Sequence, residues 1–184
     1  WLFGLASLAN AKGFDPNQAN TFVFDKNSLK EYRDAKFVYL AHQPYSQSAY
    51  YGADLATEAN SGRPFYFSIR LPDGNYRVEA VLGSDSNDTH IGIKAESRRL
   101  YLTETSLDKD EFLSVDFIVN VRSPKLTPPE LNAPGGSQVL IKSSEKNSFT
   151  WDEKLTLEFL GDAPFIKSIR VEPVNTPVIY LLGD

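Results

Sequence analysis

The stretch PFYFSIRLPDGNYRVEAVLG, residues 64–83, alternates apolar and polar side chains on both sides of a turn signal. Successive side chains of a β-strand point to opposite faces, so a period of two residues predicts a strand with one buried face. Between the two runs, Pro72 fixes φ and Gly74 permits a positive φ, a combination typical of a tight turn. The stretch therefore predicts two strands, 64–71 and 76–83, paired as a β-hairpin.

Similar short runs recur along the chain, and loops rich in Gly, Pro, Ser and Asn separate them. They are residues 20–26, THIGIKAESRRLYLT (one or two strands), EFLSVDFIVNVR, VLIK at 139–142, KLTLEFLG and IKSIRVEPV. No segment has the regular pattern of a long helix, and residues 30–41 remain open because they combine helix-like charges with a strand-like FVYLA. About eight or nine strands at this spacing predict an all-β fold, a β-sandwich of the jelly-roll type.

Alternation in at least five of these segments predicts one shared core, since large apolar faces would otherwise lie in water. The side chains expected in it are Phe65, Phe67, Ile69, Val78, Leu82, Val115, Phe117, Val119, Leu155, Leu157, Phe159, Ile169 and Val171.

The composition narrows the classes of function. The 184 residues fit one domain with part of a neighbour, and 41% hydrophobic content is enough for a core. A net charge of -5 with scattered Lys and Arg argues against nucleic-acid and membrane-surface partners. The absence of Cys excludes disulfides, thiolate metal sites and cysteine nucleophiles.

Catalytic chemistry is sparse in this sequence. His42 and His90 are the two histidines, both in polar segments typical of surface positions, and no G-x-S-x-G turn presents a nucleophilic serine. The acidic loop 85–88 lacks the glycine and the bidentate glutamate of an EF-hand. We therefore expect no catalytic residue, no cofactor and no metal site in this chain.

The two ends of the chain differ from the middle. The apolar stretch WLFGLASLANAKG contains Ala9-Asn10-Ala11, a small-x-small pattern typical of signal-peptide cleavage, although a short apolar element packed on the core is the alternative. The signal interpretation predicts a secreted or periplasmic protein. At the other end, VIYLL at 178–182 is apolar on both faces, as in a strand of an α/β sheet. Without that sheet, we expect 178–184 to pair with the sandwich edge or a neighbouring molecule.

A tyrosine-rich polar loop, residues 43–62, is the one candidate binding segment. Aromatic rings stack on the apolar face of a sugar while amides and carboxylates bind its hydroxyls. The candidate substrate-binding residues are Tyr45, Tyr50, Tyr51 and Asp54. The alternative is that these tyrosines pack the loop onto the sandwich.

Several linked segments also carry a resemblance: RPFYFSIRLPDGNYRVEAVLGS, IKAESRRLYL, FIVNVRSPKL, WDEKLTLEFLGDAPFIKSIRVEP and IYLLGD. Over roughly residues 20–184, they resemble the N-terminal domain of bacterial rhamnogalacturonan acetylesterase-like proteins. The resemblance implies a galactose-binding-like β-sandwich followed by an SGNH (GDSL-type) hydrolase domain. The glycines that this family has after Asp25 and before Tyr51 are replaced here.

The resemblance also implies a domain plan. It predicts a signal remnant and lead-in at 1–19, a β-sandwich at 20–173, and a linker with the first hydrolase strand at 174–184. Gly183 and Asp184 match the start of the family's Gly-Asp-Ser block, whose serine would come next. The implied role is a non-catalytic accessory domain, binding carbohydrate or serving as a scaffold, in a secreted serine esterase acting on pectin. Its implied partners are plant cell-wall pectin and the C-terminal SGNH domain. The alternative is a purely structural interaction domain without sugar affinity.

Overall fold

Nine strands and one helix make up most of the chain that the computed structural model describes, which is residues 13–34, 50–53, 64–126, 138–145 and 149–179. In chain order these elements are β1 (Asn20–Val23), α1 (Lys26–Asp34), β2 (Tyr51–Ala53), β3 (Phe65–Arg70), β4 (Gly74–Gly83), β5 (Thr89–Ala95), β6 (Arg99–Leu107), β7 (Phe112–Val121), β8 (Lys154–Ala163) and β9 (Ile166–Pro173).

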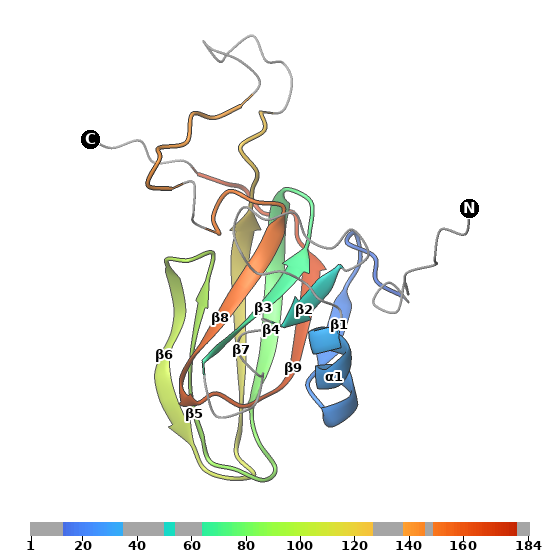
Figure 1. Cartoon of the computed structure of the whole chain (residues 1–184), viewed down its shortest axis with the longest axis vertical. Helices are drawn as coiled ribbons and strands as arrows, with labels where there is room; N and C mark the ends of the chain where they lie inside the picture. Colours follow the sequence, from blue (N-terminus) through green and yellow to red (C-terminus); the bar gives the residue numbers. More distant parts are fainter. Residues whose placement is uncertain (1–12, 35–49, 54–63, 127–137, 146–148, 180–184) are drawn as a thin grey trace.

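The strands form two antiparallel sheets that pack face to face (Figure 1). The four-stranded sheet has the order β1-β9-β4-β7, and the five-stranded sheet has the order β2-β3-β8-β5-β6. The helix α1 lies beside β1 and β2 at one edge of the sandwich (Figure 1). These observations confirm the predicted all-β sandwich.

The core lies between the two sheets and contains the predicted side chains. Of the thirteen apolar residues expected there, twelve are buried and Val115 is half-buried. Phe65 and Phe159, which are partners in the β3–β8 register, stack with their ring centroids 4.9 Å apart. The two-residue period thus identified the buried face of β3, β4, β7, β8 and β9 correctly.

The predicted hairpin of residues 64–83 is wrong. Strand β3 pairs with β2 and β8, whereas β4 pairs with β7 and β9, so the two runs belong to different sheets. The turn after Leu71 carries the chain from one sheet to the other. Alternation fixes which face of a strand is buried but not which strand lies beside it, and two apolar faces can also meet across a core.

Two local predictions also need correction, and the open alternative between helix and strand for residues 30–41 is decided for residues 30–34, which are helical. Residues 139–142 form no strand, and the side chain of Leu140 is 97% exposed. Within the predicted polar loop, Tyr51–Ala53 forms the short strand β2, which pairs with β3. Residues 26–34 form a helix because Asp25 caps it: its carboxylate accepts hydrogen bonds from the backbone N–H groups of Asn27 and Ser28.

Of residues 178–184, which were expected to pair with the sandwich edge or a neighbouring molecule, the two described residues do not pair. Val178 and Ile179 lie outside the strands, and the Ile179 side chain is 84% exposed. Pro173 and Pro177 lack the N–H that a ladder needs, which explains why pairing ends there. Residues 180–184 lie outside the described residues, as do residues 1–12 of the predicted signal remnant and lead-in at 1–19. In the described chain no helix has the length and apolar content to cross a membrane.

Candidate functional site

A cavity of about 440 Å³ opens at the end of the sandwich where β3 and β7 finish and β4 and β8 begin. These strand ends lie at the upper end of the two sheets in Figure 1. Its wall comes from short connections of both sheets and from the segment before β1. The lining residues are Pro16, Tyr50, Arg70, Leu71, Pro72, Asp73, Ser123, Lys125, Leu126 and Glu153.

Hydrogen bonds between these connections fix the frame of the cavity. The Asp73 carboxylate accepts from the backbone N–H and from the hydroxyl of Ser123, both at 2.8 Å. The Leu71 N–H donates to the carbonyl of Glu153, and the Arg70 N–H donates to the carbonyl of Tyr50. The turn between β3 and β4 is therefore tied to the end of β7 and to the start of β8.

The cavity offers charged groups beside apolar surface. Lys125 Nζ lies 2.6 Å from Glu153 Oε1, and this hydrogen bond raises the pKa of Lys125 above its usual value. Arg70 and Asp73 bring the set to two cations and two anions, so the charges balance. The Tyr50 ring packs against Phe14, with centroids 5.5 Å apart, and so has a fixed apolar support. Such a wall can bind a neutral or weakly charged polar ligand that also has an apolar face.

The structure separates the candidate residues of the tyrosine-rich loop. Tyr50 lines the cavity, whereas the Tyr51 ring lies in an aromatic cluster, 4.8 Å from the ring of Phe22. Burial raises the pKa of Tyr51 to about 12, and its hydroxyl donates to Glu31. Tyr45 and Asp54 lie outside the described residues.

Most of the polar wall was not found from the sequence. Arg70, Asp73, Ser123, Lys125 and Glu153 come from three segments that are distant in the chain. Each follows or precedes a strand, and no spacing within the sequence connects them. The turn signal at residues 72–74 predicted a connection between two strands there, but nothing in it indicated a cavity.

A buried charged cluster lies at the same end of the sandwich, built from the turn between β5 and β6 and the start of β8. Glu96 is 1% exposed, and its Oε1 accepts from the backbone N–H of Thr156 at 3.0 Å. Its Oε2 is buried without a hydrogen-bond partner in the described chain. Burial raises the pKa of Glu96 to about 8, and the neighbouring Asp152 contributes to this rise. Burial therefore favours the protonated form of Glu96 at neutral pH.

The neighbours of Glu96 extend this cluster. The Lys154 side chain is 1% exposed, and its Nζ lies 3.4 Å from Asp152 Oδ2. Burial raises the pKa of Asp152 to about 6, against the opposing effect of Lys154. The Arg122 guanidinium lies over the Trp151 ring, 4.4 Å from its centroid. Because Asp152 and Lys154 flank Glu153, this cluster lies directly behind one wall of the cavity.

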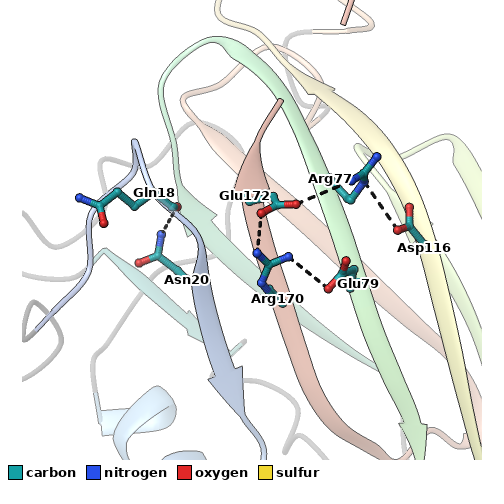
Figure 2. Close-up of polar contacts among 7 residues, drawn as sticks. All are labelled: Gln18, Asn20, Arg77, Glu79, Asp116, Arg170 and Glu172. Atoms are coloured by element: carbon teal, nitrogen blue, oxygen red, sulfur yellow. Dashed lines mark hydrogen bonds and ion pairs between the residues drawn. The ribbon is translucent and has the colours of Figure 1, made fainter. Parts of the chain in front are cut away.

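The outer face of the four-stranded sheet carries a second, exposed set of charges (Figure 2). Side chains of β4, β7 and β9 form a chain of ion pairs across the strands: Asp116 with Arg77, Arg77 with Glu172, Glu172 with Arg170, and Arg170 with Glu79. Their relative exposures of 24–58% are those of a solvated surface, where ion pairs contribute little. We assign this face no ligand.

The one described histidine is not placed for nucleophilic catalysis. His90 Nδ1 lies 2.7 Å from Asp162 and Nε2 lies 3.6 Å from Glu104. Both ring nitrogens thus face carboxylates, which leaves neither to activate a serine. The described residues contain no group of three or more His, Asp or Glu side chains arranged to hold a metal. His42 lies outside them.

This chain is similar to known proteins in its three-dimensional structure, and no similarity was found from its sequence. No family model and no curated protein matches the sequence. Among solved structures, the chain is similar to a GH26-CBM35 β-(1,4)-mannanase of Podospora anserina (13% identity, TM-score 0.39), covering 88% of this chain and 29% of that one. It is also similar to a CBM35 of Paenibacillus barcinonensis (8% identity, TM-score 0.31, covering 62% and 75%). A third is the C-terminal CBM6 of a Zobellia galactanivorans laminarinase (14% identity, TM-score 0.32, covering 84% and 98%).

These structures therefore include carbohydrate-binding modules, both isolated and as parts of larger enzymes. The chain spans less than a third of the mannanase and most of the two isolated modules.

Proposed function

We propose that this domain binds carbohydrate in the cavity at the end of the sandwich. The observation that supports this most directly is the combination of the Tyr50 ring with Arg70, Asp73, Lys125 and Glu153 around one open cavity. A pyranose ring has apolar C–H faces and a belt of hydroxyls that both donate and accept. An aromatic ring beside balanced donors and acceptors matches both features, and about 440 Å³ is within the range of small-ligand sites.

We further propose that the domain is a non-catalytic accessory part of a secreted or periplasmic carbohydrate esterase acting on pectin. The support is the resemblance of five linked segments to the N-terminal domain of rhamnogalacturonan acetylesterase-like proteins. In this proposal the deacetylation, through a serine acyl-enzyme, belongs to a following SGNH domain. Arg70 and Lys125 would supply the cations for a uronic acid carboxylate, and Lys125 would then exchange its bond to Glu153 for one to the ligand.

Titration of the isotope-labelled domain with pectin-derived oligosaccharides, followed by NMR, tests the binding site. We expect Kd values of roughly 0.1–1 mM, because an open site buries little ligand surface and must order its own side chains. Tyr50→Ala should abolish measurable binding, and Lys125→Ala should weaken it about fivefold.

Lys167→Ala is the matched control for Lys125→Ala. Lys167 is also an exposed lysine paired with a carboxylate, Asp85, but it lies away from the cavity. Its replacement should leave Kd unchanged. Absence of chemical-shift changes at millimolar ligand would contradict the binding proposal and favour a purely structural domain.

A separate experiment tests the esterase proposal. A chain extended past Asp184 should release acetate from acetylated rhamnogalacturonan, and a folded extended chain without this activity would contradict the esterase proposal.

A further inference from the structure

A second open cavity, of about 470 Å³, adjoins the first at the same end of the sandwich. The two share three lining residues, Pro16, Pro72 and Asp73, which form a ridge between them. Because the same side chains line both, a ligand seated in the first cavity is in reach of the second without leaving the protein surface. The two cavities are therefore neighbours at this end of the sandwich.

The ridge is rigid in this structure. Both oxygens of Asp73 are engaged by Ser123 at 2.8 Å, and the Tyr76 hydroxyl donates to the Pro72 carbonyl at 2.8 Å. Tyr76 is buried, so this hydrogen bond connects the ridge to the core. A chain ligand crossing a fixed ridge need not order the protein backbone, which lowers the entropic cost of binding.

The wall of the second cavity differs in chemistry from that of the first. Among the described residues that line it are three asparagines, Asn17, Asn75 and Asn175, and no lysine or arginine. Asn75 supports the wall: it donates to the Thr176 carbonyl at 2.9 Å and its carbonyl oxygen accepts from Asn120. Asn175 is exposed and makes no side-chain hydrogen bond within the described part of the chain. An amide that both donates and accepts is suited to a sugar hydroxyl.

From this arrangement we propose that the asparagine-lined cavity is a second sugar subsite, continuous with the first across the Asp73 ridge. The ligand is then a chain of at least two sugar units, with a neutral unit over Asn17 and Asn175 and the other unit over Tyr50. This inference rests on the proposed carbohydrate binding and extends it, since it predicts a dependence on ligand length that a single sugar site would not have.

The test is a calorimetric titration with D-galacturonic acid, L-rhamnose, and rhamnogalacturonan oligosaccharides of two, four and six units. We expect the two-unit ligand to bind about tenfold more tightly than either monosaccharide, and longer ligands to add little. Asn175→Ala and Asn17→Ala should remove most of this tenfold gain while leaving monosaccharide affinity unchanged. Asn87→Ala, an exposed loop asparagine outside both cavities, is the matched control and should change neither.

The outcomes separate the two proposals. Equal affinity for one-unit and two-unit ligands, or a gain that survives both asparagine variants, would overturn the second subsite and leave the carbohydrate-binding proposal intact. No saturable binding of any of these ligands at millimolar concentration would overturn both. The role of the asparagines would likewise be refuted if Tyr50→Ala abolished binding while Asn17→Ala and Asn175→Ala still bound the two-unit ligand more tightly than the monosaccharides.

Discussion

Replacing Glu96 with Gln should remove a loss of stability that the native protein suffers as the pH rises from 6 to 8. The folded state holds the Glu96 proton up to a pKa of about 8, whereas the ordinary value for an unfolded chain is 4.5. When the pKa of a carboxyl is higher in the folded than in the unfolded state, its contribution to stability is fully present below the unfolded pKa. It is lost as the pH rises to the folded pKa, because the unfolded chain releases the proton while the folded protein keeps it. The window for Glu96 is therefore pH 4.5 to 8.

The size of the effect follows from the two pKa values. Within the window, each pH unit costs about 1.4 kcal/mol of the free energy of unfolding, and the slope flattens near pH 8. Between pH 6 and 8 the loss attributable to Glu96 is then about 2 kcal/mol, or roughly 4–8 °C in Tm for a chain of this size. Burial also raises the pKa of Asp152, but to about 6, so its effect on stability levels off by about pH 7 and is shared by the native protein and the variant.

The assay is urea unfolding at half-unit steps from pH 6 to 8. The free energy of unfolding of the variant minus that of the native protein is plotted against pH. Gln keeps the oxygen that accepts from the Thr156 N–H and cannot ionise, so the difference should grow by about 2 kcal/mol across the range in favour of the variant. Asp116→Asn, at a carboxylate with 58% side-chain exposure, is the control and should give a flat difference. A flat difference for Glu96→Gln as well would refute the reasoning that burial holds this carboxyl neutral.

Three further perturbations test the fold itself by the free energy of unfolding in urea. Gly161→Ala should cost about 3 kcal/mol, because Gly161 has φ 101° and a Cβ there would clash with a backbone oxygen of β5. Gly13 has φ 89° but open space around it, so Gly13→Ala should cost about 1 kcal/mol. Equal costs would contradict the clash. Phe67→Ala should cost 3 to 5 kcal/mol, roughly, since the ring is fully buried, against about 1 kcal/mol for the partly exposed Phe112→Ala. Arg170→Ala should change stability by less than about 1 kcal/mol despite its two ion pairs, and a larger loss would show that the charged face is not a simple solvated surface.

Period-two alternation was sufficient to predict the fold class and the core of this protein. It identified Phe67, Val78 and Leu157 as buried, because the hydrophobic requirement acts on each strand separately. It was not sufficient to pair the strands. The register of β3 with β8 joins Phe65 to Phe159, across more than ninety residues, and no local signal specifies that partner. The adjacent β3 and β4 looked like a hairpin for the same reason.

The candidate site was less predictable than the core. Aromatic content drew attention to Tyr50, which lines the cavity, and equally to Tyr51, whose ring helps to build the aromatic cluster beside the core. Sequence alone does not distinguish these two neighbours, because the difference is the direction of each side chain at the start of β2. The charged wall became visible when strand ends from both sheets were brought together, as for Asp73 and Ser123.

The location of the cavity also explains why a site of this kind can be both rigid and weak. Its frame consists of strand ends held by backbone hydrogen bonds, so Asp73 and Glu153 keep their positions without a ligand. Lys125 and Glu153 already pair with each other and Ser123 already donates to Asp73, so a ligand must replace existing contacts of these groups. Rigid groups with existing partners give selectivity with little net affinity. The affinity of such a site for its ligand gains most when the domain is linked to a second binding unit. The link gives a millimolar effective concentration, which matches the Kd proposed for this domain.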